Sequence, residues 1–254
     1  MDNNDIFSRN ILFWGEYTLA QLFDKNVAVF GLGGVGGFCA ESLARAGVGK
    51  LTIVDFDTVS MSNINRQLVA LNSTVGMKKT ELFRERLLDI NPDITLEIVD
   101  DFYNSEEVII DFSKNKYDYV ADAIDTMRAK IHLIESCYNN HVPIISSMGA
   151  GNRIDPSQLY ISDLKDIENK KAPFVSNVIY QLKKRGISEG IPFVVSRETP
   201  FVKKRVEQIE KIKTNSGLDI EFNKITPSST PFVASCAGIF MASYIVQSFI
   251  KDFK

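Results

Sequence analysis

A glycine-rich loop at residues 31–37 is the first feature of this chain that could do chemistry. It follows the apolar run NVAVF and leads directly into a helical pattern, and three of its glycines fit G-x-G-x-x-G. Glycine permits the tight turn and lets the backbone approach a phosphate, and the helix N-terminus offers free N–H groups and partial positive charge. The residues expected to form this phosphate loop are Gly31, Gly33, Gly34, Val35 and Gly36.

A carboxylate closes the next apolar run, since Asp55 follows LTIV. In nucleotide-binding folds an acid at this place holds the ribose hydroxyls. Strand, loop, helix and acid together predict nucleotide binding. They do not separate a dinucleotide from ATP.

The segment after Asp55 is crowded with polar and charged side chains. Arginine offers a planar fork of donors and lysine a mobile point charge, and both suit a triphosphate whose leaving pyrophosphate gains negative charge. Asp125, at the end of a later strand pattern, could hold Mg²⁺ between phosphates. The pattern therefore favours an enzyme that uses ATP, with these further candidates: Asp57, Asn63, Asn65, Arg66, Gln67 and Lys79.

Strand and helix signals alternate through the first 150 residues. This alternation predicts crossover connections and a doubly wound (Rossmann-like), mostly parallel α/β sheet with helices on both faces. Strands are expected at 27–31, 51–55, 95–100, 118–124 and 143–148, and helices near 78–88, 105–112 and 127–139.

The pattern changes after residue 149. Turn signals and the strand-like run QLYIS predict that the sheet continues in mixed sense with antiparallel strands. Residues 165–225 are less apolar, and we expect a helical insertion there with helices at 174–184 and 201–213.

The composition is that of an ordinary globular protein, with 44% hydrophobic residues and a net charge of −3. Cys39, Cys137 and Cys236 are scattered and form no CxxC pair, so we expect core cysteines and no thiol nucleophile. No signal peptide is expected. The uncharged run 232–250 is long enough to span a bilayer, but a buried helix is favoured over a membrane anchor.

Several motifs resemble the adenylation domain of ubiquitin-activating-like enzymes of the ThiF type. They are GLGGVG, the DFD acid pair, SNINRQ, the VGxxK spacing at 75–79 and the AID strand end. The resemblance covers residues 8–165 and implies a doubly wound fold, a symmetric homodimer and adenylation of a carboxylate with ATP and Mg²⁺.

Site roles follow from this resemblance position by position. It implies that Asp55 binds ribose and that Asp57 and Asp125 lie at the Mg²⁺ ion. Arg9, in FSRNILFWGE, is similar to an early arginine that reaches the phosphates from the partner subunit. The triphosphate contacts implied are Asn63, Arg66 and Lys79.

The run GAGNRIDPSQLYISDL and the segment VSRE at 195–198 resemble one branch, the bacterial tRNA threonylcarbamoyladenosine dehydratases. This implies adenylation of the threonine carboxylate of N6-threonylcarbamoyladenosine-37 in tRNA. The neighbouring carbamoyl nitrogen then closes a ring and releases AMP, an intramolecular attack that needs no separate nucleophile. A cytoplasmic enzyme is expected.

A basic region supports a nucleic-acid substrate. Residues 165–213 contain twelve Lys or Arg against six Asp or Glu. Such a balance suits a phosphate backbone. We therefore expect an ATP-binding adenylation domain at 1–164, a basic substrate-facing insertion at 165–230, and a C-terminal apolar helix at 231–254 on the core or dimer interface. The candidate tRNA contacts are Lys183, Lys184, Arg185, Lys203, Lys204 and Arg205.

Other functions remain open at this point. The same adenylation chemistry would serve an activator of a ubiquitin-like sulfur-carrier protein ending in Gly-Gly, and a sulfur-transfer or desulfurase-type partner is a further expectation. The glycine loop and Asp55 alone would suit an NAD-dependent oxidoreductase. A nucleotide sensor without chemistry would not need the clustered cations.

Overall fold

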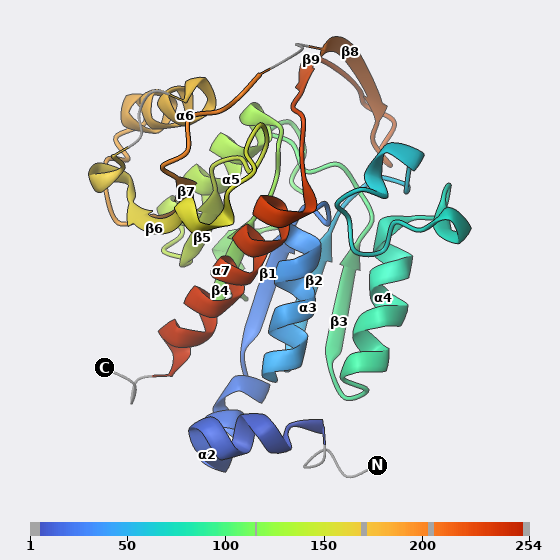
Figure 1. Cartoon of the computed structure of the whole chain (residues 1–254), viewed down its shortest axis with the longest axis vertical. Helices are drawn as coiled ribbons and strands as arrows, with labels where there is room; N and C mark the ends of the chain where they lie inside the picture. Colours follow the sequence, from blue (N-terminus) through green and yellow to red (C-terminus); the bar gives the residue numbers. More distant parts are fainter. Residues whose placement is uncertain (1–5, 115, 169–171, 203–205, 251–254) are drawn as a thin grey trace.

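A seven-stranded sheet forms the centre of the computed structural model, which describes residues 6–114, 116–168, 172–202 and 206–250 (Figure 1). Its order is β3-β2-β1-β4-β5-β7-β6, and every neighbouring pair is parallel except the antiparallel pair β6–β7. This confirms the mostly parallel doubly wound sheet and its antiparallel extension. The strands are β1 (Asn26–Phe30), β2 (Lys50–Val54), β3 (Thr95–Val99), β4 (Tyr119–Asp122), β5 (Ile144–Ser147), β6 (Leu159–Asp163) and β7 (Pro192–Ser196).

Helices cover both faces of the sheet, as expected (Figure 1). Alternation along β1 divides the core, because Val27 and Val29 pack with helices α3, α4 and α7, whereas Ala28 and Phe30 pack with α5 and α6. The helices are α2 (Ser8–Phe23), α3 (Gly36–Ala46), α4 (Lys79–Ile90), α5 (Met127–Asn139), α6 (Pro173–Lys184) and α7 (Pro231–Phe249).

Two expected helices are wrong. The stretch 105–112 is irregular and ends in a short 3₁₀ turn at Phe112–Lys114. The stretch 201–213 contains β8 (Val206–Lys213), which pairs with β9 (Asp219–Thr226) in an antiparallel hairpin. Apolar residues spaced by three at 206, 209 and 212 are compatible with a helix, but the turn at Gly217 (φ +94°) reverses the chain and the partner strand decides. The boundary expected at residue 165 does not coincide with the end of the sheet, because β7 belongs to it.

The order in which the chain adds strands to the sheet reverses between β1 and β4. Chain progression runs outward from β1 through β2 to β3 on one side, and from β4 onward on the other. Backbone hydrogen bonds continue past the end of β1 on both sides, since Gly31 N–H donates to the Val54 carbonyl of β2 (2.8 Å) and Ala123 N–H, just after β4, donates to the Phe30 carbonyl (2.9 Å). Ligands of doubly wound sheets bind at the carboxyl ends of the strands at such a point.

Helix α7 is the C-terminal helix that the sequence predicts. By length and composition alone it is the one helix among the described residues that could cross a membrane, a test that core helices also pass. In the fold it lies against α3 (Figure 1), and Val233, Ala237, Met241 and Ile245 on one side of it are almost completely buried. Packing on the core accounts for the apolar character of that side.

Candidate active site

The phosphate loop connects β1 to α3, and two of its glycines are sterically required. Gly31 has φ +84°, and a Cβ there would lie 3.0 Å from the Ala123 carbonyl oxygen. A Cβ on Gly36 would lie 1.8 Å from the Gly31 carbonyl oxygen. At Gly33 the nearest atom is the Gln67 amide nitrogen at 3.7 Å, so this glycine leaves open space above the loop. That space suits close approach of a phosphate.

Asp55, directly after β2, is bound to the phosphate loop. Its carboxylate accepts the Leu32 N–H (2.5 Å) and the Asp57 N–H (2.8 Å). Burial raises the pKa of the Asp55 carboxyl, and the Lys79 ammonium, 3.9 Å away, acts in the opposite direction. In this geometry Asp55 holds the loop in place, and its expected contact with ribose stays a prediction.

Lys79 is the first residue of α4 and is 3% exposed. Its ammonium lies 2.7 Å from the Asp57 carboxylate, whose side chain is 39% exposed. The backbone repeats this link, because Lys79 N–H donates to the Asp57 carbonyl (3.1 Å). A buried cation is thus fixed beside the phosphate loop, next to a carboxylate that solvent can reach.

Arg66 packs against the phosphate loop at Gly34. Its Cγ would be 3.3 Å from a Cβ on Gly34, and its guanidinium donates to the Ser62 carbonyl (2.9 Å). Burial lowers the pKa of Arg66, and the electrostatic attraction of Asp125 raises it. Arg66 and Asp125 therefore interact electrostatically although they are 59 positions apart in the chain.

The remaining polar candidates divide into two kinds. Asn63 accepts the Ser60 N–H (3.1 Å) and so stabilises its own turn, and Asn65 donates to the Ser229 carbonyl (2.9 Å) ahead of α7. Gln67 is 8% exposed, and its buried side-chain amide oxygen has no hydrogen-bond partner among the described residues. An unsatisfied acceptor next to Gly33 suits a ligand donor.

A buried polar cluster that sequence reasoning missed supports Asp125. Asp122, at the end of β4, and Lys130, on α5, are both 0% exposed and lie 2.7 Å apart. Asp122 also accepts the Ser146 hydroxyl (2.6 Å) and the Ile124 N–H (3.0 Å), and Ser146 lies 3.1 Å from Lys130. The turn that presents the exposed Asp125 is thus anchored in the core. In the sequence, the two serines of the apolar run PIISSM hinted at this cluster.

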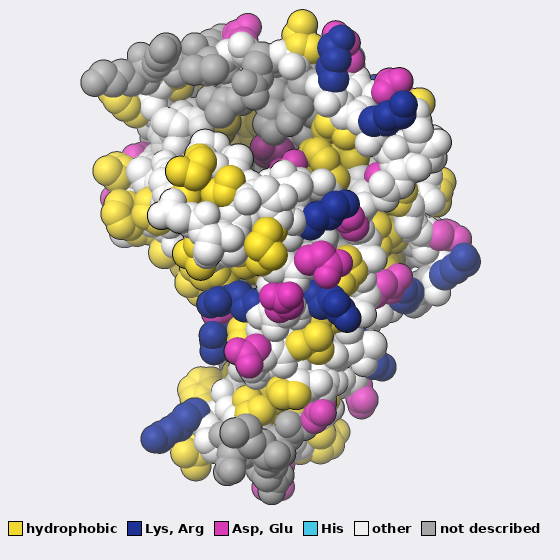
Figure 2. Space-filling view, turned by 90° about the vertical axis from the view of Figure 1, so that its right-hand side faces the viewer, with side chains coloured by type: hydrophobic (Ala, Val, Ile, Leu, Met, Phe, Trp, Pro, Cys, Tyr) yellow, Lys and Arg dark blue, Asp and Glu magenta, His cyan; other side chains and the backbone are white. Residues whose placement is uncertain are grey.

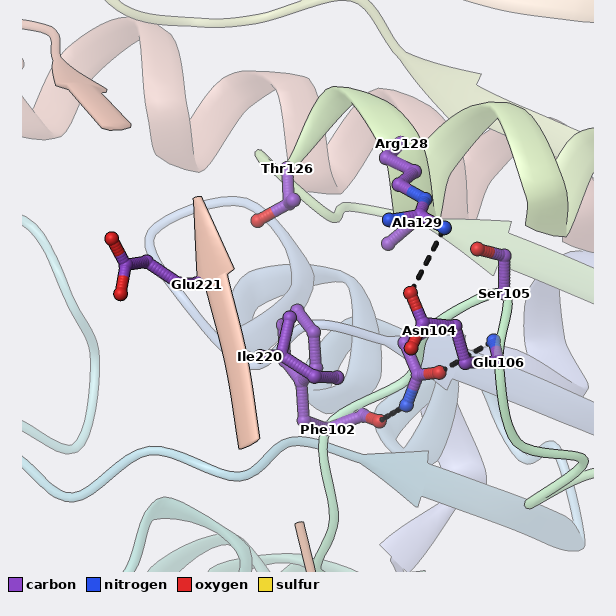
Figure 3. A pocket seen from close by; sticks show the side chains of 9 residues that line it. All are labelled: Phe102, Asn104, Ser105, Glu106, Thr126, Arg128, Ala129, Ile220 and Glu221. Carbon is purple, nitrogen blue, oxygen red and sulfur yellow. Dashed lines mark hydrogen bonds and ion pairs between the residues drawn. The ribbon is translucent and has the colours of Figure 1, made fainter. Parts of the chain in front are cut away.

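A pocket lies beside this turn, between the loop after β3, the start of α5 and strand β9 (Figure 3). Phe102, Ala129 and Ile220 line it with apolar groups. The ion pair between Arg128 and Glu106 (2.9 Å) closes another side. The pocket combines apolar walls with polar edges next to Asp125, as expected for a heterocyclic ligand.

Arg9 lies far from the phosphate loop of its own chain. It is exposed on α2, and the neighbouring Asn10 donates to the Arg45 carbonyl (3.0 Å) in the last turn of α3. The phosphate loop is at the first turn of α3, roughly 14 Å away at 1.5 Å per residue. Figure 1 shows α2 at the opposite end of the sheet.

The one basic cluster among the described residues is also not at the loop. Lys183, Lys184 and Arg185 are exposed at the end of α6, and Arg185 pairs with Glu135 (3.1 Å) in the second half of α5. Lys203, Lys204 and Arg205 lie outside the described residues. Figure 2 shows Lys and Arg interspersed with Asp and Glu on the side that bears α4. The described residues on that side form no continuous basic surface.

The cysteines are in the core as predicted, with one difference. Cys39 and Cys137 are buried, and burial raises the pKa of both thiols. Cys236 is half-buried on α7. Raised pKa values remove the thiolate that a nucleophile requires, so neither buried cysteine suits covalent catalysis.

Along most of its length the chain is similar to known proteins. The model of the ThiF family matches residues 7–246. A tRNA threonylcarbamoyladenosine dehydratase of Bacillus subtilis is 42% identical over 97% of this chain and 95% of that protein. The E. coli enzyme TcdA, solved in complex with ATP, superimposes with a TM-score of 0.83 at 30% identity, covering 98% of this chain and 96% of that one. An E. coli molybdopterin-synthase adenylyltransferase is 37% identical over 60% of this chain and 59% of that protein.

Proposed function

The chain belongs to the ThiF family, and from that premise we propose that it is an ATP-dependent tRNA threonylcarbamoyladenosine dehydratase. The threonine carboxylate of N6-threonylcarbamoyladenosine-37 attacks the α-phosphorus of ATP and pyrophosphate leaves. The carbamoyl nitrogen then attacks the acyl carbon, the ring closes and AMP leaves. The observation that carries the proposal is the similarity to a curated dehydratase along almost the whole of both chains.

In the proposed reaction, the residues of the site have distinct roles. Lys79 and Arg66 stabilise the charge that develops on the leaving pyrophosphate, because both are held in place before the reaction, Lys79 by its part-buried ion pair with Asp57 and Arg66 by its hydrogen bond to the Ser62 carbonyl. The N–H groups of the phosphate loop bind phosphate oxygens. We assign the adenine ring to the pocket beside Asp125, which Phe102 and Ile220 line.

Asp125 and Asp57 fit a magnesium ion that arrives with ATP. Both carboxylates follow strand ends, Asp125 is exposed, and the Asp57 side chain is 39% exposed. Among the described residues no group of three or more His, Cys, Asp or Glu could hold a metal alone. Mg²⁺ commonly uses one or two carboxylates and takes its other ligands from water and phosphates. When bound, the ion neutralises charge on the phosphates.

We also propose a homodimer, because Arg9 cannot reach the loop of its own chain. Exposed apolar side chains on the same helix favour a covered face, with Leu12, Phe13 and Tyr17 each at least 70% exposed. A test is complementation between Arg9→Ala and Lys79→Ala subunits, each expected to be inactive alone. Mixed dimers regain activity if Arg9 acts across the interface. Lack of recovery, with mixed dimers shown to form, contradicts it.

The decisive experiment uses purified protein, Mg-ATP and tRNA carrying threonylcarbamoyladenosine. Mass spectrometry of the digested tRNA should show a nucleoside lighter by one water, formed together with AMP. An unchanged nucleoside in intact tRNA contradicts the proposal. Pyrophosphate exchange with a Gly-Gly carrier protein would then favour the carrier-protein activator. A tRNA substrate implies a cytoplasmic location, and a sulfur-transfer partner stays a prediction.

A further inference from the structure

Hydrogen bonds join three chain segments at Asn152, close to the phosphate loop. The Asn152 carbonyl accepts the Phe201 N–H (2.8 Å), and its own N–H donates to the Ser228 carbonyl (2.7 Å). Its side-chain oxygen accepts the Ser228 N–H (2.9 Å). Asn152 adopts φ +61°, which a non-glycine residue rarely does and asparagine tolerates best. We call this point the Asn152 junction.

Large hydrophobic side chains project from the Asn152 junction into solvent. Phe201 is 72% exposed, Ile154 63% and Phe232 54%. Each lies within two residues of a junction contact, since the Thr230 hydroxyl donates to the Arg153 carbonyl (3.3 Å). Single exposed hydrophobic residues are ordinary, but several on one bonded junction indicate a binding surface.

This surface borders the phosphate loop. Asn65, next to Arg66, donates to the Ser229 carbonyl within the junction. In the first turn of α7, the Ala234 Cβ would lie 3.2 Å from a Cβ on Gly34. When a substrate places its carboxylate at a phosphate on the loop, the parts of the substrate next to that carboxylate can therefore contact this surface.

We propose that Phe201 and Phe232 form a stacking platform for unpaired bases of the RNA substrate, an inference that rests on the proposed function. Proteins hold splayed-out RNA bases by stacking them on aromatic side chains, which accept any base. Charge in the sequence agrees, because the cations Lys203, Lys204 and Arg205 follow Phe201 and Val202 directly.

The test measures tRNA affinity of the full-length protein by fluorescence anisotropy at several salt concentrations. Phe201→Ala and Phe232→Ala should each raise Kd by about 5- to 100-fold, the range for loss of one base stack. Phe201→Leu should lose as much as Phe201→Ala, and Phe201→Trp should bind like wild type, because the aromatic face matters. Tyr138→Ala, which removes another exposed aromatic ring (44%), should change nothing.

The salt series separates stacking from phosphate contact. Loss of a stack leaves the slope of log Kd against log salt unchanged, whereas loss of a phosphate contact reduces it. Unchanged Kd values for both alanine variants, or wild-type affinity of Phe201→Leu, would overturn the platform. A switch from dimer to monomer in Phe201→Ala, measured by sedimentation, would overturn it too and assign the surface to a second copy of the chain.

Failure of the platform and failure of the proposed function give different results. If wild type dehydrates the tRNA nucleoside and the alanine variants do so equally at limiting tRNA, only the platform fails. If wild type binds tRNA through Phe201 and Phe232 but leaves the nucleoside unchanged, only the proposed function fails. If wild type does not bind tRNA, both fail.

Discussion

Replacement of Lys130 by methionine should destabilise the fold strongly. Lys130 and Asp122 are both 0% exposed, with 2.7 Å between ammonium and carboxylate. Methionine fills much of the same space, so the main effect is electrostatic: the positive charge beside Asp122 is lost. The Asp122 carboxylate would stay buried with only Ser146 and Ile124 as donors. Removal of one partner of a buried pair costs about 3–5 kcal/mol, out of a total stability of about 5–15 kcal/mol.

The expected fall in melting temperature is about 6–20 °C, at roughly 2–4 °C per kcal/mol for a domain of this size. Calorimetry or circular dichroism at fixed protein concentration measures it. Lys25→Met is the matched control, because Lys25 pairs with Asp118 at 3.3 Å with side chains 31% and 37% exposed. An exposed pair contributes about 1 kcal/mol or less.

Equal melting temperatures for Lys130→Met and Lys25→Met would refute this reasoning. A second variant tests the cause: Lys130→Met combined with Asp122→Leu removes both charges and should recover part of the lost stability. If the double variant is less stable than Lys130→Met, the uncompensated charge is not the origin of the loss.

Three further predictions concern the site and its surroundings. Gly36→Ala should fold poorly because its Cβ would meet backbone at 1.8 Å, whereas Gly33→Ala should keep its melting temperature and lose ATP affinity in calorimetric titration; equal melting temperatures would contradict this. Asp125→Ala should fold normally, because Asp125 is exposed, and should form AMP at least 100-fold more slowly, on the order of the loss of one preorganised electrostatic group; wild-type turnover would exclude Asp125. Burial lowers the pKa of His132, so the folded protein binds a proton at this imidazole more weakly than the unfolded protein does. The contribution of neutral His132 to stability is therefore complete above a pH of about 6.5 and falls as the pH drops below that value. His132→Gln should therefore lose less stability than wild type between neutral pH and pH of about 5, and parallel melting curves would contradict it.

Much of the site was predictable because its parts are local in the chain. The phosphate loop joins a strand to the next helix, and Asp55 closes the following strand, so short-range rules of turn and strand geometry place both at one sheet edge. Asp125 follows a third strand of the same sheet and reaches that edge for the same reason. Parallel strands bring their carboxyl ends together whatever the sequence between them.

Other parts of the fold and site depend on contacts between partners that the pattern of residue types along the chain does not indicate. Residues 206–213 have a spacing compatible with a helix, and only the partner strand at 219–226 makes them a hairpin. Asn63 has the side chain of a ligand contact, yet its own turn occupies the oxygen.

By itself, the sequence determined the doubly wound sheet, the phosphate loop and the acids at the strand ends, because these follow from alternation and neighbouring residues. The tertiary structure alone decided that Lys130 neutralises Asp122, that Arg9 is remote from its own loop, and that three distant segments meet at Asn152. The physical reason is that burial and long-range hydrogen bonds choose among partners far apart in the chain, and local propensity does not distinguish these partners.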